Sequence, residues 1–193
     1  MDQTRIETLD AKKTALIVLD LQNLIVGMKP HSPYSAETVV ENAVMLAEKF
    51  TEKAAFVVFV RVSFAPDGKD NFRPRTDAPP GKAQFAEGWD VLVPELQPFK
   101  NAHVIIKKQM GAFYGTDLDL QLRRRGIDTV VLSGISTIYS VDTTAREAFS
   151  HAYHVVFAED AMTCASKDHQ DFECQYVFPL MGKIRSTGEI ALV

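Results

Sequence analysis

The chain has 193 residues, of which 46% are hydrophobic, so it is long enough to bury the core of a single domain spanning residues 1–193. Its formal net charge of −4 at pH 7 lacks the basic excess of nucleic-acid-binding domains. No apolar stretch reaches the length of a bilayer span, and no secretory signal precedes the first predicted strand. We therefore expect a cytoplasmic protein that binds neither nucleic acid nor a membrane.

Hydrophobic patterning predicts alternating strands and helices along most of the chain. Residues 14–19 form an apolar run that ends at Asp20, and helical spacing begins after Ser35, a typical N-cap residue. Residues 55–64 are apolar on both faces until Arg61, which is typical of a central parallel strand. The later pattern predicts strands at 103–107, 128–133, 153–158 and 183–185, helices at 116–125, 140–151 and 166–178, and a capped turn at 186–189. This order predicts an α/β fold of three layers (α/β/α) with a mainly parallel, doubly wound sheet.

Residues 65–99 interrupt this regular pattern with a loop-rich insertion. The insertion contains six of the nine prolines, together with an aromatic cluster around Phe85 and Trp89. Long irregular insertions often serve as lids or oligomer contacts, and a plain surface loop is the alternative. Because this insertion is more apolar than a free surface loop needs to be, we expect the protein to self-associate.

Polar side chains follow three of the predicted strands at the point where each strand ends. Asp20 ends the first strand and Lys107 ends the strand at 103–107. A further strand breaks at Gly134 into a tight loop, and a helix is expected to begin near Ser140. Because ligands bind outside the carboxyl ends of strands in open parallel sheets, these side chains are expected to share one pocket at the ends of adjacent strands. The unpaired N–H groups of the helix's first turn suit an oxyanion.

Three segments of the chain resemble the signature blocks of the isochorismatase-like hydrolases. They are Ala15–Asn23, Lys107–Leu118 and Gly134–Arg146, and the similarity runs in order from about residue 12 to the C-terminus. This superfamily also contains nicotinamidases and N-carbamoylsarcosine amidase. In its cysteine-using members the third block carries the nucleophilic Cys where this chain has Ser140, and usually an Asn where it has Ile138. Isochorismatases proper also lack that Cys.

The resemblance implies that Asp20 acts as a general acid or base with Lys107 as its partner. Lys107 is preferred to Lys108 because it lies six residues before Phe113, as the family's catalytic lysine does relative to the equivalent aromatic residue. Pairing holds a carboxylate and an ammonium ionised while burial pushes both toward neutrality, which leaves a proton that can move. The plainer alternative is that Asp20 and Ser140 are only N-cap residues.

The remaining candidate residues are expected to position the substrate or an oxyanion. They are Gln22, Phe113, Ser136, Thr137 and Tyr139, with Gln22 expected to orient Asp20. The resemblance also implies an unusual peptide bond, of which a cis bond is one form, near residues 135–137. Further candidates are the guanidinium groups of Arg61, Arg73 and Arg75, which could bind substrate carboxylates through two hydrogen bonds each.

Three functions fit these features. The leading one is an isochorismatase-type hydrolase of a small, carboxylate-bearing molecule, in which Asp20 protonates an enol ether or similar carbon and water adds. The second is an amide or carbamoyl C–N hydrolase that uses Ser140 as nucleophile, although none of the five histidines lies in the three blocks to serve as its base. The third is a catalytically silent family member that binds a small ligand.

No cofactor is implied by the sequence, and no metal site either. Nicotinamidases carry an Asp-x-His block just after the second strand, where this chain has Arg61-Val62-Ser63-Phe64, and paired histidines or clustered carboxylates are missing. Cys164 and Cys174 lack metal-ligand spacing and are expected to be packing residues. Family members commonly form dimers or tetramers, so the expected partners are a small-molecule substrate and further copies of the chain, as a homodimer or homotetramer.

Overall fold

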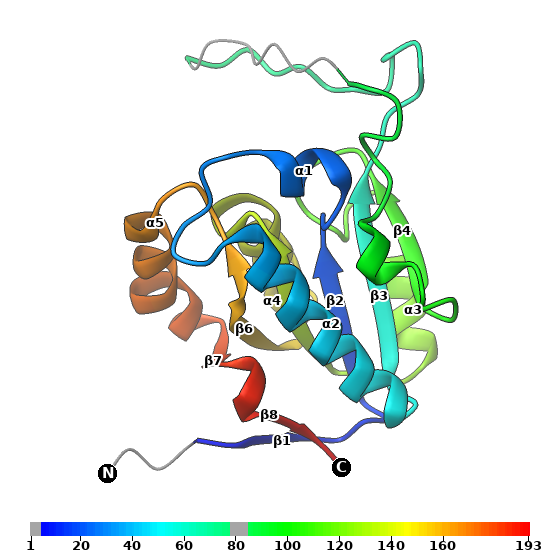
Figure 1. Cartoon of the computed structure of the whole chain (residues 1–193). Helices are drawn as coiled ribbons and strands as arrows, with labels where there is room; N and C mark the ends of the chain where they lie inside the picture. Colours follow the sequence, from blue (N-terminus) through cyan, green and yellow to red (C-terminus); the bar gives the residue numbers. More distant parts are fainter. Residues whose placement is uncertain (1–4, 78–84) are drawn as a thin grey trace.

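The computed structural model describes residues 5–77 and 85–193. A sheet of six parallel strands lies at its centre, in the order β4-β3-β2-β5-β6-β7 (Figure 1). The strands are β2 (Thr14–Leu19), β3 (Phe56–Val62), β4 (His103–Lys107), β5 (Thr129–Ile135), β6 (His154–Thr163) and β7 (Gly182–Arg185). The longer helices are α2 (Ala36–Glu52), α3 (Leu118–Arg124), α4 (Asp142–Ser150) and α5 (Lys167–Phe172). The predicted three-layer α/β fold with a parallel sheet is confirmed.

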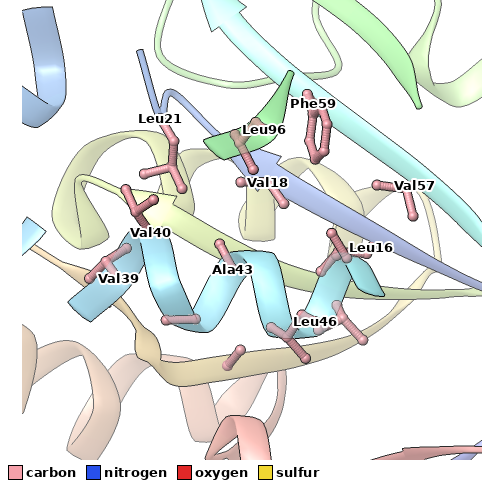
Figure 2. Packing of buried hydrophobic residues seen from close by; sticks show 14 of the residues in the cluster. Leu16, Val18, Leu21, Val39, Val40, Ala43, Leu46, Val57, Phe59 and Leu96 are labelled. Carbon is pink, nitrogen blue, oxygen red and sulfur yellow. The ribbon is translucent and has the colours of Figure 1, made fainter. Parts of the chain in front are cut away.

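The alternation of side chains along β2 explains why helices cover both faces of the sheet. Leu16 and Val18 point toward α2 and form one buried cluster with its apolar residues and with β3 (Figure 2). Ile17 and Leu19 point the other way and pack in a second cluster with residues of α3 and α4. All residues of β2 are buried, as expected for a central strand between two helical layers.

Two predicted helix starts are confirmed by their capping hydrogen bonds. The Ser35 hydroxyl accepts a hydrogen bond from the Thr38 backbone N–H at 3.2 Å, immediately before α2. Ser186 and Glu189 form a capping box around the short 3₁₀ turn η5 (Thr187–Glu189). Both are local patterns of side chain and backbone, which explains why the sequence alone revealed them.

The predicted helix near Ser140 begins earlier than expected. A π-helical turn, η2 (Thr137–Val141), comes first and continues directly into α4. Ser140 therefore lies inside the turn, and Ser136 occupies the N-cap position, so the N-cap interpretation of Ser140 is wrong. The helix predicted at 166–178 is likewise divided into α5, the π-helical turn η3 (Glu173–Val177) and the start of the 3₁₀ turn η4 (Phe178–Leu180).

Several short helices and strands were not predicted from the sequence. The helix α1 (Asn23–Gly27) follows the end of β2, and a small parallel pair joins β1 (Glu7–Leu9) to β8 (Ile190–Leu192). Elements of three to five residues are too short to show hydrophobic periodicity. The sequence also ended the strand at 153–158 too soon, because β6 continues to Thr163.

The insertion predicted at 65–99 divides into parts. Residues 65–77 contain no helix or strand, residues 78–84 lie outside the described residues, and a 3₁₀ turn, η1 (Pro94–Leu96), packs Leu96 into the core. Figure 1 shows that the described residues of the insertion extend beyond α1, at the end of the sheet where β2 and β3 finish. Within the described ranges, no helix is long and apolar enough to cross a bilayer.

Candidate active site

Asp20, Lys107 and Ser140 come from three different elements and meet at the carboxyl end of the sheet. Asp20 directly follows β2, Lys107 is the last residue of β4, and Ser140 lies in η2 after β5. The expectation that adjacent strands supply the acid and the amine is wrong, because β3 lies between β2 and β4. Strands lie about 4.8 Å apart, so roughly 10 Å separates the two backbones. The long lysine side chain spans that distance.

The three side chains form one closed set of hydrogen bonds. Lys107 Nζ lies 2.8 Å from Asp20 Oδ2 and donates to Ser140 Oγ at 2.6 Å. Ser140 Oγ in turn donates to Asp20 Oδ2 at 2.7 Å. A third acceptor of Lys107 is the Met110 carbonyl oxygen at 2.5 Å, so all three protons of the ammonium have acceptors. The predicted convergence of these residues is confirmed.

Burial is the main influence on the pKa of the Asp20 carboxyl. Burial raises the pKa of Asp20 above its ordinary value, and this effect exceeds the opposing influence of the Lys107 charge and of the hydrogen bonds from Lys107 and Ser140. Oδ2 receives those contacts, whereas Oδ1 is buried without a hydrogen-bond partner. One oxygen of the carboxyl therefore keeps its hydrogen-bonding capacity unused among the described residues.

The backbone at Asp20 turns sharply to bring the carboxyl to this point. Asp20 has a φ of 56°, a left-handed conformation that Asp adopts more readily than most residues. Its N–H donates to the Val60 carbonyl oxygen at 2.8 Å, and its own carbonyl oxygen accepts from the Gln22 N–H at 2.8 Å. Asp20 is not the N-cap of α1, because Gln22 holds that position.

Gly134 lets β5 approach the end of β2 beside this turn. Its φ is 121°, and a Cβ at this position would lie 2.0 Å from the Leu19 carbonyl oxygen. Only glycine fits such a close approach. The peptide bond between Ile135 and Ser136, one residue further along the chain, is cis, as the resemblance implied.

Two side chains of α4 hold the loop that follows Lys107. Thr144 Oγ1 accepts from the Ala112 N–H at 3.1 Å, and Glu147 Oε2 accepts from the Phe113 N–H at 3.0 Å. This loop carries the Met110 carbonyl oxygen that binds Lys107. Thr144 and Glu147 therefore fix the loop relative to the helix that follows Ser140. Nothing in the sequence marked either residue, since they reach backbone atoms distant along the chain.

A cavity of about 540 Å³ opens over Asp20, Lys107 and Ser140. Ser136 and Tyr139 line it, as predicted. The rest of the lining is mainly apolar. It comes from α1 and the loop after it, from the end of β3 and the insertion, from the loop after Lys107, and from the residues at the end of β6. Lining residues that the sequence analysis did not single out include Ile25, Met28, Lys29, His31, Phe72, Met110 and Ala165.

Three predicted site residues lie outside the cavity lining. The Gln22 amide oxygen accepts from the Val62 N–H at 2.8 Å, so Gln22 holds the end of β3 instead of orienting Asp20. Thr137 Oγ1 donates to Gln170 Oε1 at 2.7 Å. Phe113 is buried and stacks on His151, with ring centroids 5.2 Å apart. Each of these side chains therefore has a packing or bonding role in the structure, away from the lining.

The arginines predicted to bind a substrate carboxylate also lie outside the cavity lining. Arg61 forms an ion pair with Asp90, with Nη1 2.5 Å from Oδ2. Arg73 and Arg75 are exposed, and neither lines the cavity. In the part of the chain that the structure describes, no three His, Cys, Asp or Glu side chains are grouped so that they could hold a metal ion.

The two cysteines are free thiols in the structure. Cys164 is buried and lines the cavity, and its Sγ lies 3.0 Å from the Ser166 carbonyl oxygen. Burial raises the pKa of Cys164, and burial together with nearby acidic groups raises the pKa of Cys174 to about 12. Both therefore stay in the weakly reactive thiol form near neutral pH.

The chain is similar to known proteins over most of its length. A family model described as the isochorismatase domain matches residues 14–189. The uncharacterized isochorismatase family protein YwoC of Bacillus subtilis is 43% identical, over 94% of each chain. The ureidoacrylate amidohydrolase RutB of Pantoea ananatis is 32% identical, over 78% of this chain and 69% of the relative.

The chain is also similar to solved structures of isochorismatase family proteins and of an amidase. An isochorismatase family protein from Burkholderia thailandensis superimposes with a TM-score of 0.91 and 40% identity, over 96% of each chain. The N-carbamoylsarcosine amidase from Thermoplasma acidophilum superimposes with a TM-score of 0.73 and 26% identity, over 91% of this chain and 96% of the amidase. These relatives share the whole fold with the chain, not only the region around the site.

Proposed function

Because the chain belongs to the isochorismatase family of hydrolases, we propose that it hydrolyses a small molecule by general acid–base catalysis at Asp20, without a covalent intermediate. The observation that carries the proposal is the state of the Asp20 carboxyl. Its Oδ1 is buried, has no hydrogen-bond partner among the described residues and belongs to a residue that lines the cavity. Burial also raises its pKa, which favours a proton that can be transferred.

The roles of the other two residues follow from their hydrogen bonds. The Lys107 ammonium donates to Asp20, to Ser140 and to the Met110 carbonyl oxygen. Lys107 therefore fixes the position of the Asp20 carboxyl and offsets the charge of its ionised form. Protonated Asp20 transfers its proton to an enol ether or similar carbon of the substrate. Water then adds to the resulting cation, and the proton that the water releases returns to Asp20. The hemiketal formed in this way breaks its C–O bond, which gives a carbonyl compound and an alcohol as the hydrolysis products. Ser140 and the loop before it position the substrate or the water.

A second function is favoured by one contact. The Ser140 hydroxyl donates to Asp20 at 2.7 Å, which is the arrangement of a nucleophile and its base. In that mechanism Ser140 attacks an amide or carbamoyl carbon, as suits relatives that include RutB and N-carbamoylsarcosine amidase. A carboxylate is a weak base for an alcohol, so the noncovalent mechanism is the better supported of the two.

Two single substitutions separate these mechanisms. The protein is first screened with isochorismate, ureidoacrylate and simple amides, and turnover of the best substrate is then compared in Asp20→Asn and Ser140→Ala. General acid–base groups contribute about 10²–10⁴-fold to rate. A positioning hydroxyl contributes about 1 kcal/mol, which is several-fold. The proposal expects the larger loss in Asp20→Asn.

A larger loss in Ser140→Ala, together with labelling of Ser140 by serine-directed acylating reagents, would instead establish the covalent mechanism. Absence of turnover across the whole panel would favour the third function, a silent member of the family that binds a ligand. Circular dichroism of both variants serves as the control for folding.

A further inference from the structure

We propose that the cavity recognises a ligand with an apolar body and a carboxylate group, and that Lys29 is the residue that binds this carboxylate. The inference rests on the proposed function in one respect, because it takes this cavity as the place of reaction. It assigns to Lys29 the role that Arg61, Arg73 and Arg75 do not fill, since none of the three lines the cavity.

Among the described residues, the ion pairs of the cavity lining leave one lysine unpaired. Asp20 is the one acidic side chain in the described lining, and it is paired with Lys107 at 2.8 Å. Lys108 also lines the cavity, but its Nζ lies 2.6 Å from Asp70 Oδ2, outside the lining. Lys29 is the remaining lysine of the lining, and it forms no ion pair among the described residues. The cavity therefore carries an excess of positive charge, which favours an anionic ligand.

Glu37 carries a charge that interacts with that of Lys29. Hydrogen bonds from its own backbone and from Ser35 lower the pKa of Glu37, and the charge of Lys29 lowers it further. Glu37 is fully exposed and does not line the cavity. Because no ion pair of the described residues joins Glu37 to Lys29, Lys29 is the lining lysine left to pair with a ligand carboxylate.

The backbone that carries Lys29 is held against the cavity. Met28, Lys29, Pro30 and His31 are consecutive lining residues in the stretch between α1 and α2, which runs at the end of the sheet where β2 finishes (Figure 1). The next residue, Ser32, donates its N–H to the Cys164 carbonyl oxygen at 2.8 Å and accepts the Cys164 N–H at 3.3 Å. Because Cys164 also lines the cavity, this pair of bonds fixes the stretch to the cavity wall.

The remaining walls suit an apolar body, such as one ring. The aromatic residues are Phe64 just after β3, Phe72 in the insertion and Tyr139 in η2. The aliphatic residues include Ile25 of α1 and Ile135 of β5. Cavities of about 300–1,000 Å³ hold small organic ligands, and this one has about 540 Å³. A ligand of this kind places its apolar part on these walls and its carboxylate near Lys29.

Phenylacetate and 2-phenylethanol test the assignment without any turnover. The two probes share a phenyl ring and differ in charge, and neither has a bond for a hydrolase to cleave. Their affinities are measured by NMR titration on the wild-type protein and on Lys29→Met, Lys29→Arg and Lys69→Met. Lys69 is a matched control, because it is exposed, pairs with Asp67 at 3.2 Å and does not line the cavity.

The wild-type protein is expected to bind phenylacetate about fivefold more tightly than 2-phenylethanol, the size of effect typical of one partly exposed ion pair. Lys29→Met should abolish this preference, whereas Lys29→Arg and Lys69→Met should keep it. The same preference in Lys29→Met as in the wild type, or no binding of either probe in the cavity, would overturn the assignment. Because nothing is hydrolysed, the outcome is independent of whether Asp20 proves to be the acid.

Discussion

Lys107 reaches from the last residue of β4 across β3 to Asp20, with 2.8 Å between Nζ and Oδ2, and both side chains are almost wholly buried. A buried ion pair of this kind is a poor source of net stability, because desolvation of both charges opposes their attraction. The pair is therefore better explained by its chemistry. Both residues line the cavity, and one oxygen of the carboxyl has no hydrogen-bond partner in the described part of the chain.

Removing one partner of the pair should destabilise the fold strongly. Lys107→Met leaves the Asp20 carboxyl buried without its cation, and we expect a loss of about 3–5 kcal/mol in the free energy of unfolding, measured by urea denaturation. The double variant Asp20→Asn/Lys107→Met should recover much of that loss.

The neighbouring lysine provides the matched control for this prediction. Lys108 is 41% exposed and pairs with Asp70, so Lys108→Met should cost at most about 1 kcal/mol. Equal losses in Lys107→Met and Lys108→Met would contradict the role given to the buried pair.

The pH dependence of turnover should report the acid role of Asp20. Burial raises the pKa of Asp20 above its ordinary value, so the protonated form persists to a higher pH than for an exposed aspartate. An acid catalyst is lost as pH rises through that raised pKa, and kcat/KM should therefore fall with increasing pH. The profile of kcat/KM from pH 4 to pH 9 measures this. A rate that rises over the same range would indicate instead that the ionised carboxylate acts as a base.

A cysteine placed at position 140 should be far more reactive than the two natural thiols. In Ser140→Cys the new thiol would take the place of a hydroxyl that accepts from the Lys107 ammonium at 2.6 Å, and a neighbouring cation lowers a thiol pKa. We expect rapid alkylation of Cys at 140 by iodoacetamide at pH 7, followed by mass spectrometry. Cys164 and Cys174, whose pKa values are raised, should react slowly in the same sample.

The wild-type protein is the control for the alkylation experiment, and alkylation there at the rate of the variant would refute the prediction. Amidase activity gained by Ser140→Cys would further show that the surroundings of the nucleophile position are competent for the chemistry of the cysteine-using relatives.

Gly134 should tolerate no side chain. A Cβ at this position would lie 2.0 Å from the Leu19 carbonyl oxygen, and the φ of 121° disfavours other residues. Gly134→Ala is expected to lower the free energy of unfolding by more than about 3 kcal/mol, or to prevent folding. Gly188→Ala is the matched control, because nothing lies within 4 Å of its Cβ position, and it should change stability by less than about 1 kcal/mol. Similar stability of the two variants would contradict the close approach.

The protein should self-associate in solution. Several large apolar side chains are exposed, among them Phe72, Met110 and Tyr139 around the cavity. Exposed apolar groups gathered in this way are typical of a binding or association surface. Light scattering at micromolar concentration should therefore give the mass of a dimer or tetramer, and a mass of 21.5 kDa would be that of the monomer and would refute the expectation.

The sequence by itself determined the order of the main elements and the position of the acid, the amine and the hydroxyl. Apolar runs such as residues 14–19 reveal a buried strand wherever they occur, and a charged residue directly after such a run stands out, as Asp20 does. Ser35 and the Ser186–Glu189 pair were predictable for a similar reason, since capping depends on residues three positions apart.

Only the tertiary structure decided which side chains face the cavity and what each one contacts. Gln22 lies two residues from Asp20 yet bonds to Val62, and Lys29 lines the cavity from a loop that shows no pattern in the sequence. The side chain of Lys107 meets Asp20 although a whole strand separates their backbones. The physical reason is that hydrophobic periodicity and capping are local along the chain, whereas strand order, loop paths and hydrogen-bond partners depend on contacts between residues far apart in sequence.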